Sequence, residues 1–288
     1  MSSLETGLMA VATGLYALHA VLTVRRALRL GEGRPLERWG PVVAAMALHT
    51  AFLVSRSVAA RGLPVSSRLG SVALFLWVTA VLYLAAGRPY RLEGAAVVVW
   101  PLYALGLVGM WALASREPMQ RVSLAQFWLV LHLVPVYAGY AGFAVAAGAG
   151  LTYLVQERLL RGKGGRALWR KLPALETLER VDWAALSLGF PALTLGLVAG
   201  AVWAEESSEL LGRGWYADPK VVGGFVVWGF YAAVLHVRLM ARLRGRRAAW
   251  LTIAGFVLTL ATFVASHAYA ATPESARPFP SGTVSDAT

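Results

Sequence analysis

The five histidines of this chain all lie inside long apolar stretches. A neutral imidazole carries a donor and an acceptor that lipid cannot satisfy, so a histidine in a membrane helix normally faces the protein interior and pairs with another helix or binds a ligand. A hydrogen bond across a helix pair explains any single one, but it explains the whole set less well. Two neutral imidazoles from different helices at one depth can also ligate haem iron across a flat cavity. The histidines are His19, His49, His132, His236 and His267.

The chain contains no cysteine. This excludes disulfides, thiolate metal sites, iron–sulfur clusters and covalent haem attachment through a Cys-x-x-Cys-His motif on this chain. Any metal chemistry therefore uses histidine or oxygen ligands. The formal net charge of +12 would suit nucleic acid, but the basic residues stand in short loops between apolar segments, where membrane topology explains them better. We therefore expect no nucleic-acid partner.

The composition is that of an integral membrane protein. Of the 288 residues, 58% are hydrophobic and 15% are charged, and the mean hydropathy is +0.59. Apolar runs of about 18 to 20 residues pass almost without charge, which is long enough for a helix to cross a bilayer. The sequence therefore predicts an all-α polytopic membrane protein with about eight transmembrane helices, of which the fifth is long enough to protrude. The predicted spans are roughly 6–25, 40–58, 70–87, 94–114, 124–156, 184–204, 221–241 and 249–271.

The loops between these spans alternate in basicity, and the excess of Lys and Arg marks cytoplasmic loops. The basic loops are the first, the third, the dense run 158–180 and the last, 238–247, so both chain ends are predicted to be extracytoplasmic. Because Glu5 and no basic residue precedes the first span, we expect no cleaved signal peptide. We predict a single transmembrane domain over 1–271 and a disordered extracytoplasmic tail over 272–288, which is rich in Pro, Ser and Gly.

This topology divides the histidines by depth. His132 lies near the start of a helix that enters from outside, and His267 lies near the outer end of the last helix, so both belong near the outer face. His236 lies near the cytoplasmic end of the seventh span and His49 near the middle of the second, so both belong deeper. His19 matches the depth of His236 at least as well as His49 does, and depth alone does not choose between them.

The loop between the sixth and seventh spans combines tryptophan, glycine, charge and proline. Turns at Gly and Asp-Pro, anchoring of aromatic rings at the headgroups and a proline at a helix start account for most of it. The loop and the following helix also resemble the tryptophan-rich signature of the cytochrome c assembly (CcsA/ResC/HemX-like) proteins. The matching residues are Gly212, Trp215, Asp218, Pro219, Lys220, Trp228, Tyr231 and Leu235-His236-Val237-Arg238. Two tryptophans, a tyrosine and a glutamate of the pattern are replaced, at Leu211, Gly214, Ala217 and Val221.

The resemblance implies a set of ligands for haem b. In that family the histidines that flank the tryptophan-rich loop are external haem ligands, and by order and depth they correspond to His132 and His267. The loop, with Trp215 and Asp218, would supply a haem-docking surface. The membrane-embedded pair would correspond to His49 and His236, which hold haem during its passage outward, and His19 is then a structural residue.

The resemblance also implies partners and a location. They are apocytochrome c, a partner subunit of the ResB/CcsB type, membrane lipid and the bacterial cytoplasmic membrane. The predicted function is haem binding and its export or presentation in cytochrome c biogenesis of the system II type, with membership of a haem lyase or synthetase complex left open by the replaced tryptophans. The alternative is a HemX-like regulatory or assembly subunit that stabilises a partner without delivering haem. A b-type electron carrier is disfavoured, because no predicted helix carries two histidines.

Overall fold

The structure of this chain, a computed structural model, is built from α-helices. It describes residues 2–29, 39–60, 62, 68–90, 92–112, 127–161, 172–206 and 215–269. Within these residues there are eight α-helices and two short 3-10 helices, and each predicted apolar stretch lies on one of the α-helices, which confirms the all-α prediction. The elements are α1 (Ser3–Arg29), α2 (Trp39–Ala60), α3 (Arg68–Tyr90), η2 (Leu92–Gly94), α4 (Ala96–Ala112), α5 (Phe127–Arg161), α7 (Leu175–Glu206), η3 (Trp215–Ala217), α9 (Pro219–Met240) and α10 (Gly245–Tyr269).

Six of the described helices are long and apolar enough to cross a membrane, namely α1, α2, α3, α5, α7 and α9. The apolar helix α4 is shorter, with 17 residues, and α10 has 25 residues. Large apolar side chains lie exposed along the outer surface of α7, among them Leu188, Leu195 and Val198. Such a surface is expected where a helix faces lipid. The chain is therefore a polytopic membrane protein.

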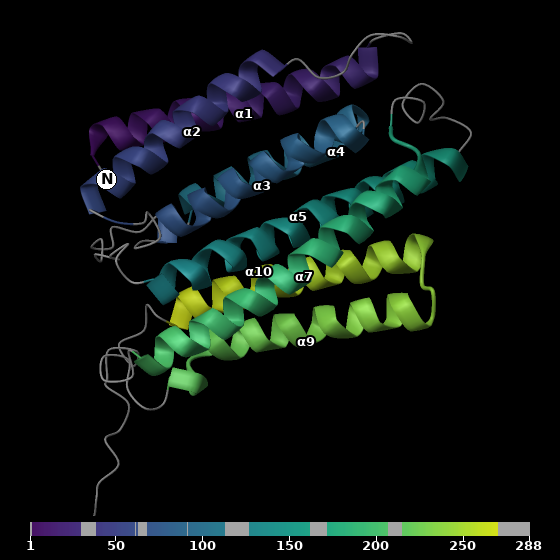
Figure 1. The fold of residues 1–288 in the computed structure, drawn as a ribbon. Coiled ribbons are helices and arrows are strands. Elements are labelled where there is room, and N and C mark those ends of the chain that lie inside the picture. The colour runs from purple at the N-terminus through teal and green to yellow at the C-terminus, as the bar shows by residue number, and fades with distance from the viewer. Residues whose placement is uncertain are drawn as a thin grey trace, which may run out of the picture.

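The helices lie side by side, with α1 and α2 at one edge, α5 and α7 in the middle and α9 at the opposite edge (Figure 1). Among the described elements, α5 and α7 contact each other most extensively, and α10 packs on both α5 and α9. Two apolar clusters fill the interior. One joins α1 to α4 around Tyr16, Phe52 and Trp100. The other joins α5, α7 and α9 around Phe143 and Tyr231, whose rings stack with centroids 3.6 Å apart.

The first helix is fixed at its start by polar groups. The backbone amide of Glu5 donates to the Ser2 hydroxyl at 3.1 Å, and the Glu5 carboxylate accepts from the Ser2 amide at 2.9 Å, which is the reciprocal arrangement of a capping box. Glu5 also pairs with Arg56 near the end of α2 at 3.6 Å, with both side chains buried. The pair therefore ties the end of α2 to the start of α1.

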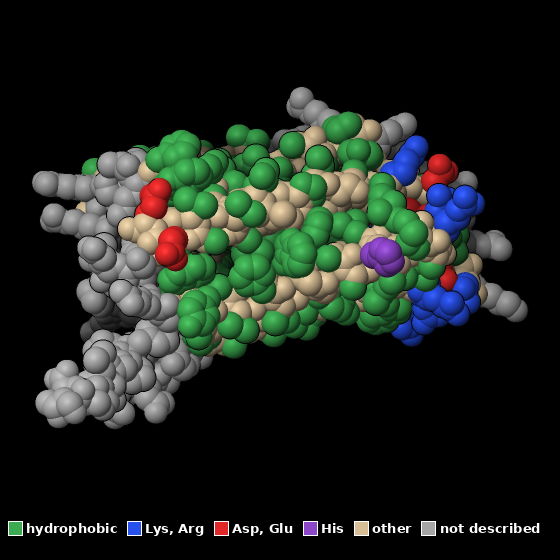
Figure 2. All heavy atoms as spheres, turned by 60° about the horizontal axis from the view of Figure 1, so that its bottom comes forward, with side chains coloured by type: hydrophobic (Ala, Val, Ile, Leu, Met, Phe, Trp, Pro, Cys, Tyr) green, Lys and Arg blue, Asp and Glu red, His purple; other side chains and the backbone are tan. Residues whose placement is uncertain are grey.

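Basic side chains gather at one end of the face drawn in Figure 2. Figure 2 shows Lys and Arg side chains gathered at one end together with some Asp and Glu, further Asp and Glu side chains at the other end, and a broad belt of hydrophobic side chains between them. This is the distribution expected of a membrane protein whose cytoplasmic ends carry the basic residues. The basic end includes Arg158, Arg161, Arg180, Arg242, Arg244, Arg246 and Arg247.

Helix α7 begins at Leu175, nine residues before the apolar stretch predicted to start at 184. The difference lies in a polar turn that contains Asp182, which hydropathy assigns to a loop. Asp182 and Arg238 of α9 form a charged hydrogen bond at 2.5 Å, and each side chain is only 5% exposed. Arg238 also lies over the Trp183 ring, 5.3 Å from its centroid. The carboxylate of Asp182 is neutralised by Arg238, and the Trp183 ring covers the guanidinium group. The charged residue is therefore accommodated inside the helix, which extends through this segment.

Some sequence predictions lie outside the described residues. They include the extracytoplasmic tail over 272–288, the first cytoplasmic loop, and Gly212, Arg213 and Gly214 of the tryptophan-containing loop.

The buried ion pair between α7 and α9 predicts a large effect of a single substitution. Asp182→Ala leaves Arg238 buried without its carboxylate and should lower the free energy of unfolding by about 3–5 kcal/mol. The measurement is denaturant-induced unfolding in detergent, followed by circular dichroism. As a control, Arg161→Ala removes an ion pair with Glu157 in which Arg161 is 71% exposed, and should cost less than about 0.5 kcal/mol. Equal losses in the two variants would contradict the prediction.

Candidate functional site

The two central helices approach each other through glycines. A Cβ atom added to Gly139 of α5 would lie 2.9 Å from the Gly189 carbonyl oxygen of α7, and one added to Gly142 would lie 3.1 Å from the Ala185 carbonyl oxygen. Side chains at these positions would force the backbones apart. Small residues at helix interfaces permit this approach in membranes, where packing rather than water exclusion drives association.

His132 lies at the end of this glycine contact that is nearer the start of α5 and the end of α7. Its Nδ1 atom lies 2.7 Å from the Gly196 carbonyl oxygen, and a Cβ atom on Gly200 would lie 2.4 Å from the same nitrogen. A carbonyl oxygen only accepts hydrogen bonds, so Nδ1 carries the proton and Nε2 keeps its lone pair. A metal-ligating histidine commonly holds its second ring nitrogen in this way. His132 could therefore bind a ligand through Nε2.

The packing of α5 on α10 relates His132 to His267. The two helices run antiparallel (Figure 1), and Gly150 of α5 contacts Ala249 of α10, because a Cβ on Gly150 would lie 3.3 Å from the Ala249 carbonyl oxygen. His132 lies 18 residues before Gly150, and His267 lies 18 residues after Ala249. At 1.5 Å of rise per residue, each is displaced about 27 Å from that contact in the same direction. The backbone positions of the two histidines are thus matched in depth, while the His267 side chain lies outside the described residues.

Trp203 adds a polar group on the same side of α7 as the histidine contact. Gly200 follows Gly196 by four residues and Trp203 follows Gly200 by three, so the three residues share one helix face. The indole nitrogen of Trp203 is buried and, among the described residues, has no hydrogen-bond partner. An indole N–H donates only, so the C-terminal part of α7 holds a buried donor that no described residue pairs with.

The described part of the tryptophan-containing loop connects α7 to α9. Trp215 Nε1 donates a hydrogen bond to the Glu205 carboxylate at 3.3 Å, which joins the loop to the last turn of α7. Asp218 caps α9 by accepting from the Lys220 amide at 2.7 Å, and Pro219 follows at the first helical position. Trp215 and Asp218, which the sequence predicts for haem docking, thus make hydrogen bonds within the protein, and the described part of the loop lies at the N-terminal end of α9.

His19 and His49 lie together in the aromatic cluster of α1 to α4. His19 is 1% exposed and packs edge-on against Trp100, with 5.1 Å between ring centroids. His49 is fully buried and packs edge-on against Tyr16 at 6.1 Å. Within the described residues, neither ring nitrogen of His49 completes a hydrogen bond of standard geometry, although the Ala73 backbone lies near the ring.

His236 lies in different surroundings, on the exposed side of α9. This helix packs on α7 and α10 and stands at the edge opposite α2 (Figure 1). The described structure therefore brings His236 next to neither His49 nor His19. The assignment of an inner pair to His49 and His236 stays a prediction.

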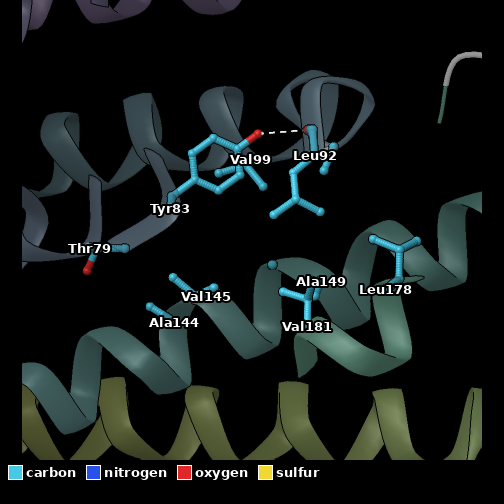
Figure 3. Close-up of a pocket in the computed structure, with 11 residues that line it drawn as sticks. Thr79, Tyr83, Leu92, Val99, Ala144, Val145, Ala149, Leu178 and Val181 are labelled. Atoms are coloured by element: carbon cyan, nitrogen blue, oxygen red, sulfur yellow. Dashed lines mark hydrogen bonds between the residues drawn. The ribbon is translucent and has the colours of Figure 1, made fainter. Parts of the chain in front are cut away.

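A small apolar cavity lies between the α3–α4 layer and the α5–α7 pair (Figure 3). Tyr83, Val145 and Leu178 line it, and the Tyr83 hydroxyl beside it donates to the Leu92 carbonyl oxygen at 3.1 Å. Its volume is about 30 Å³, whereas sites for drug-sized ligands measure about 300–1,000 Å³. The cavity thus has room for water and none for a macrocycle.

Sequence reasoning did not single out Gly196 or Gly200. The signal was present, since two glycines four residues apart in an apolar helix indicate a close helix contact. What the sequence could not give was the residue that fills the contact, because this depends on how α5 is rotated and shifted against α7.

Known proteins are similar to this chain over most of its length. The family model described as cytochrome C assembly protein matches residues 39–269. Cytochrome c biogenesis protein CcsA of Synechococcus elongatus is 30% identical over 254 residues, with 72% of this chain and 76% of the relative covered. The CcsA proteins of Gloeothece citriformis (27% over 257 residues, 72% and 77% covered) and Guillardia theta (28% over 242 residues, 76% and 78% covered) are similar to comparable extents.

With its family model matched over most of its length, the chain belongs to the cytochrome c assembly protein family. It is a membrane protein of cytochrome c biogenesis.

The cap of α9 predicts how Asp218 responds to substitution. Asp218→Ala removes the acceptor of the Lys220 amide and should lower the free energy of unfolding by about 1 kcal/mol, whereas Asp218→Asn should stay close to the unsubstituted protein because asparagine caps equally well. Denaturant unfolding in detergent measures both. A loss of equal size for the two variants would show that the charge of Asp218, rather than its cap, stabilises the structure.

Proposed function

We propose that this protein binds haem b at an extracytoplasmic site formed by His132 and His267 and presents it to apocytochrome c. The observation that carries the proposal is the orientation of His132, whose Nδ1 is bonded to the Gly196 carbonyl oxygen so that Nε2 is left to ligate iron. The matched depth of His132 and His267 on neighbouring helices supports their use as a pair. Bis-imidazole ligation requires that match in depth.

The residues around His132 fit such a ligand. The buried indole N–H of Trp203 has no hydrogen-bond partner within the described residues, and a haem propionate is an acceptor that would satisfy it. Trp215 and Asp218 hold the loop between α7 and α9 at the same end of the molecule. Lys220, exposed beside that loop, would pair with a second carboxylate or with lipid headgroups.

The chemistry of this site is ligation. The imidazoles of His132 and His267 would hold the iron of bound haem and control its redox state, and the thioether bonds would form on the cysteines of the apocytochrome. This chain contributes no thiol, since it contains no cysteine. Its residues bind and orient haem, and a partner subunit of the ResB/CcsB type would complete the lyase or synthetase activity.

The inner pair belongs to the proposal only as a second, deeper step. His49 is buried among α1 to α4 and His236 is exposed on α9, so haem held by both would require the helices between them to move. If the helices do not move, a haem bound by His236 on the exposed side of α9 would need its second iron ligand from another molecule.

The alternative is a HemX-like subunit that stabilises a partner without delivering haem. The replacement of pattern residues at Ala217 and Val221 favours it, since aromatic and acidic side chains that would contact haem are absent there. The two functions differ in whether the outer histidines are required.

Haem binding tests the proposal directly. The chain purified in detergent should take up haem b and give a low-spin bis-imidazole spectrum, quantified by the pyridine haemochrome method. His132→Ala and His267→Ala should each abolish that spectrum, because each removes an axial ligand. His19→Phe, a replacement of similar size in the aromatic cluster, should leave it unchanged. A chain that stays haem-free when haem is supplied overturns the proposal, and normal cytochrome c accumulation in cells with both outer histidines replaced would favour the regulatory alternative.

The proposed location is the bacterial cytoplasmic membrane, with eight transmembrane helices and both chain ends outside. Since the chain contains no cysteine, single substitutions report sidedness. In intact spheroplasts, Tyr216→Cys at the outer loop should react with a membrane-impermeant maleimide, and Arg244→Cys between α9 and α10 should react only after lysis. The two positions are exposed alike. The reverse labelling pattern would invert the topology and remove His132 and His267 from the outer face.

A further inference from the structure

His132 contacts the backbone of Gly196 on α7 and occupies the space that a side chain at Gly200 would fill. In an α-helix the carbonyl oxygen of residue 196 accepts the amide of residue 200. Because Gly200 has no side chain, the outward side of that oxygen stays open, and the His132 ring occupies it at 2.7 Å. The same carbonyl therefore serves the helix and the imidazole together.

The space at Gly200 is specific to the histidine. The three heavy atoms nearest to an added Cβ would be Nδ1 at 2.4 Å, Cε1 at 2.8 Å and Cγ at 3.2 Å, and all three belong to the His132 ring. At Gly196, in contrast, an added Cβ would meet Val136 at 2.5 Å and the α5 backbone at 3.0 Å. Gly196 thus keeps the helices close, whereas Gly200 accommodates one imidazole.

We infer that Gly196 and Gly200 are positioning residues of the outer haem site, because Gly200 leaves room for the His132 ring and the Gly196 carbonyl oxygen accepts a hydrogen bond from Nδ1–H, which leaves Nε2 as the iron ligand. The inference rests on the proposed function for the identity of the ligand. The assignment of the tautomer is independent of the proposed function, because it follows from a hydrogen bond to a carbonyl oxygen. Neither glycine touches haem in this arrangement, and both act through the imidazole.

The matched pair of variants is Gly200→Ala and Gly142→Ala. Gly200→Ala displaces the His132 ring from the carbonyl. Gly142→Ala places a Cβ atom 3.1 Å from the Ala185 carbonyl oxygen and 3.2 Å from the Gly189 Cα, so it also pushes α5 away from α7 but does not touch His132. Any general effect of separating α5 from α7 appears in both variants, and loss of ring placement appears only in the first. Circular dichroism and gel filtration in detergent select preparations that remain folded.

The first measurement uses the protein without haem. With ¹⁵N-labelled histidine, the His132 signal, assigned by its absence in His132→Ala, should report the Nδ1-protonated tautomer in the unsubstituted chain and in Gly142→Ala. Gly200→Ala should shift that signal toward the Nε2-protonated tautomer or an exchanging mixture. An unchanged His132 tautomer in Gly200→Ala overturns the inference whether or not haem binds.

The second measurement is haem affinity by spectroscopic titration. Gly200→Ala should weaken binding by about 10- to 100-fold, the effect expected when the group that orients a metal-ligating histidine is lost, while Gly142→Ala should stay near the unsubstituted protein. Added imidazole should restore the low-spin spectrum of Gly200→Ala, because free imidazole replaces a misplaced axial ligand. Equal affinity in the two glycine variants overturns the inference. Failure of every form, including the unsubstituted chain, to bind haem overturns the proposed function and leaves the tautomer measurement to decide the role of the glycines.

Discussion

The close approach of α5 and α7 through glycine is the constraint on which the rest of the structure depends. Lipid is as apolar as leucine, so helices in a membrane gain little from apolar burial alone and associate where their surfaces fit closely. Gly139 and Gly189 bring the two backbones to a distance that no side chain would allow. The other helices build on this pair, with α10 packed on α5 and α9 packed on α7. Glycines of α7 also contact His132 of α5, which lies between the same two helices.

Two buried ion pairs join neighbouring helices in different parts of the bundle. Asp182 and Arg238 neutralise each other between α7 and α9, and Glu5 and Arg56 do the same between α1 and α2. Removing one member of such a pair leaves a buried charge, so these contacts fix how neighbouring helices are placed. They hold the bundle at both of its ends while the glycines hold it along its length.

The histidines illustrate how position within the bundle decides what one residue type can do. His132 donates to a backbone carbonyl and keeps one nitrogen for a ligand, His49 is enclosed by aromatic rings, and His236 is exposed on an outer helix. The family match begins at residue 39, yet α1 supplies Tyr16 and His19 to the same aromatic cluster as His49. The first helix is thus part of the packed structure although it lies outside the matched range.

The sequence by itself determined the membrane class, the all-α fold and one helix for each of the eight apolar stretches, because the length and polarity of a run are local properties of the chain. It also predicted that His132 and His267 share a depth, since both are counted from helix ends on the same side. It missed the first turns of α7, because Asp182 reads as a loop residue until Arg238, 56 positions away, is brought beside it. Only the tertiary structure decided that His19 and His49 share one cluster, that His236 is exposed and that a glycine carbonyl holds His132. These depend on the rotation and register of each helix against its neighbours, which many distant contacts set together and which no single stretch of sequence encodes.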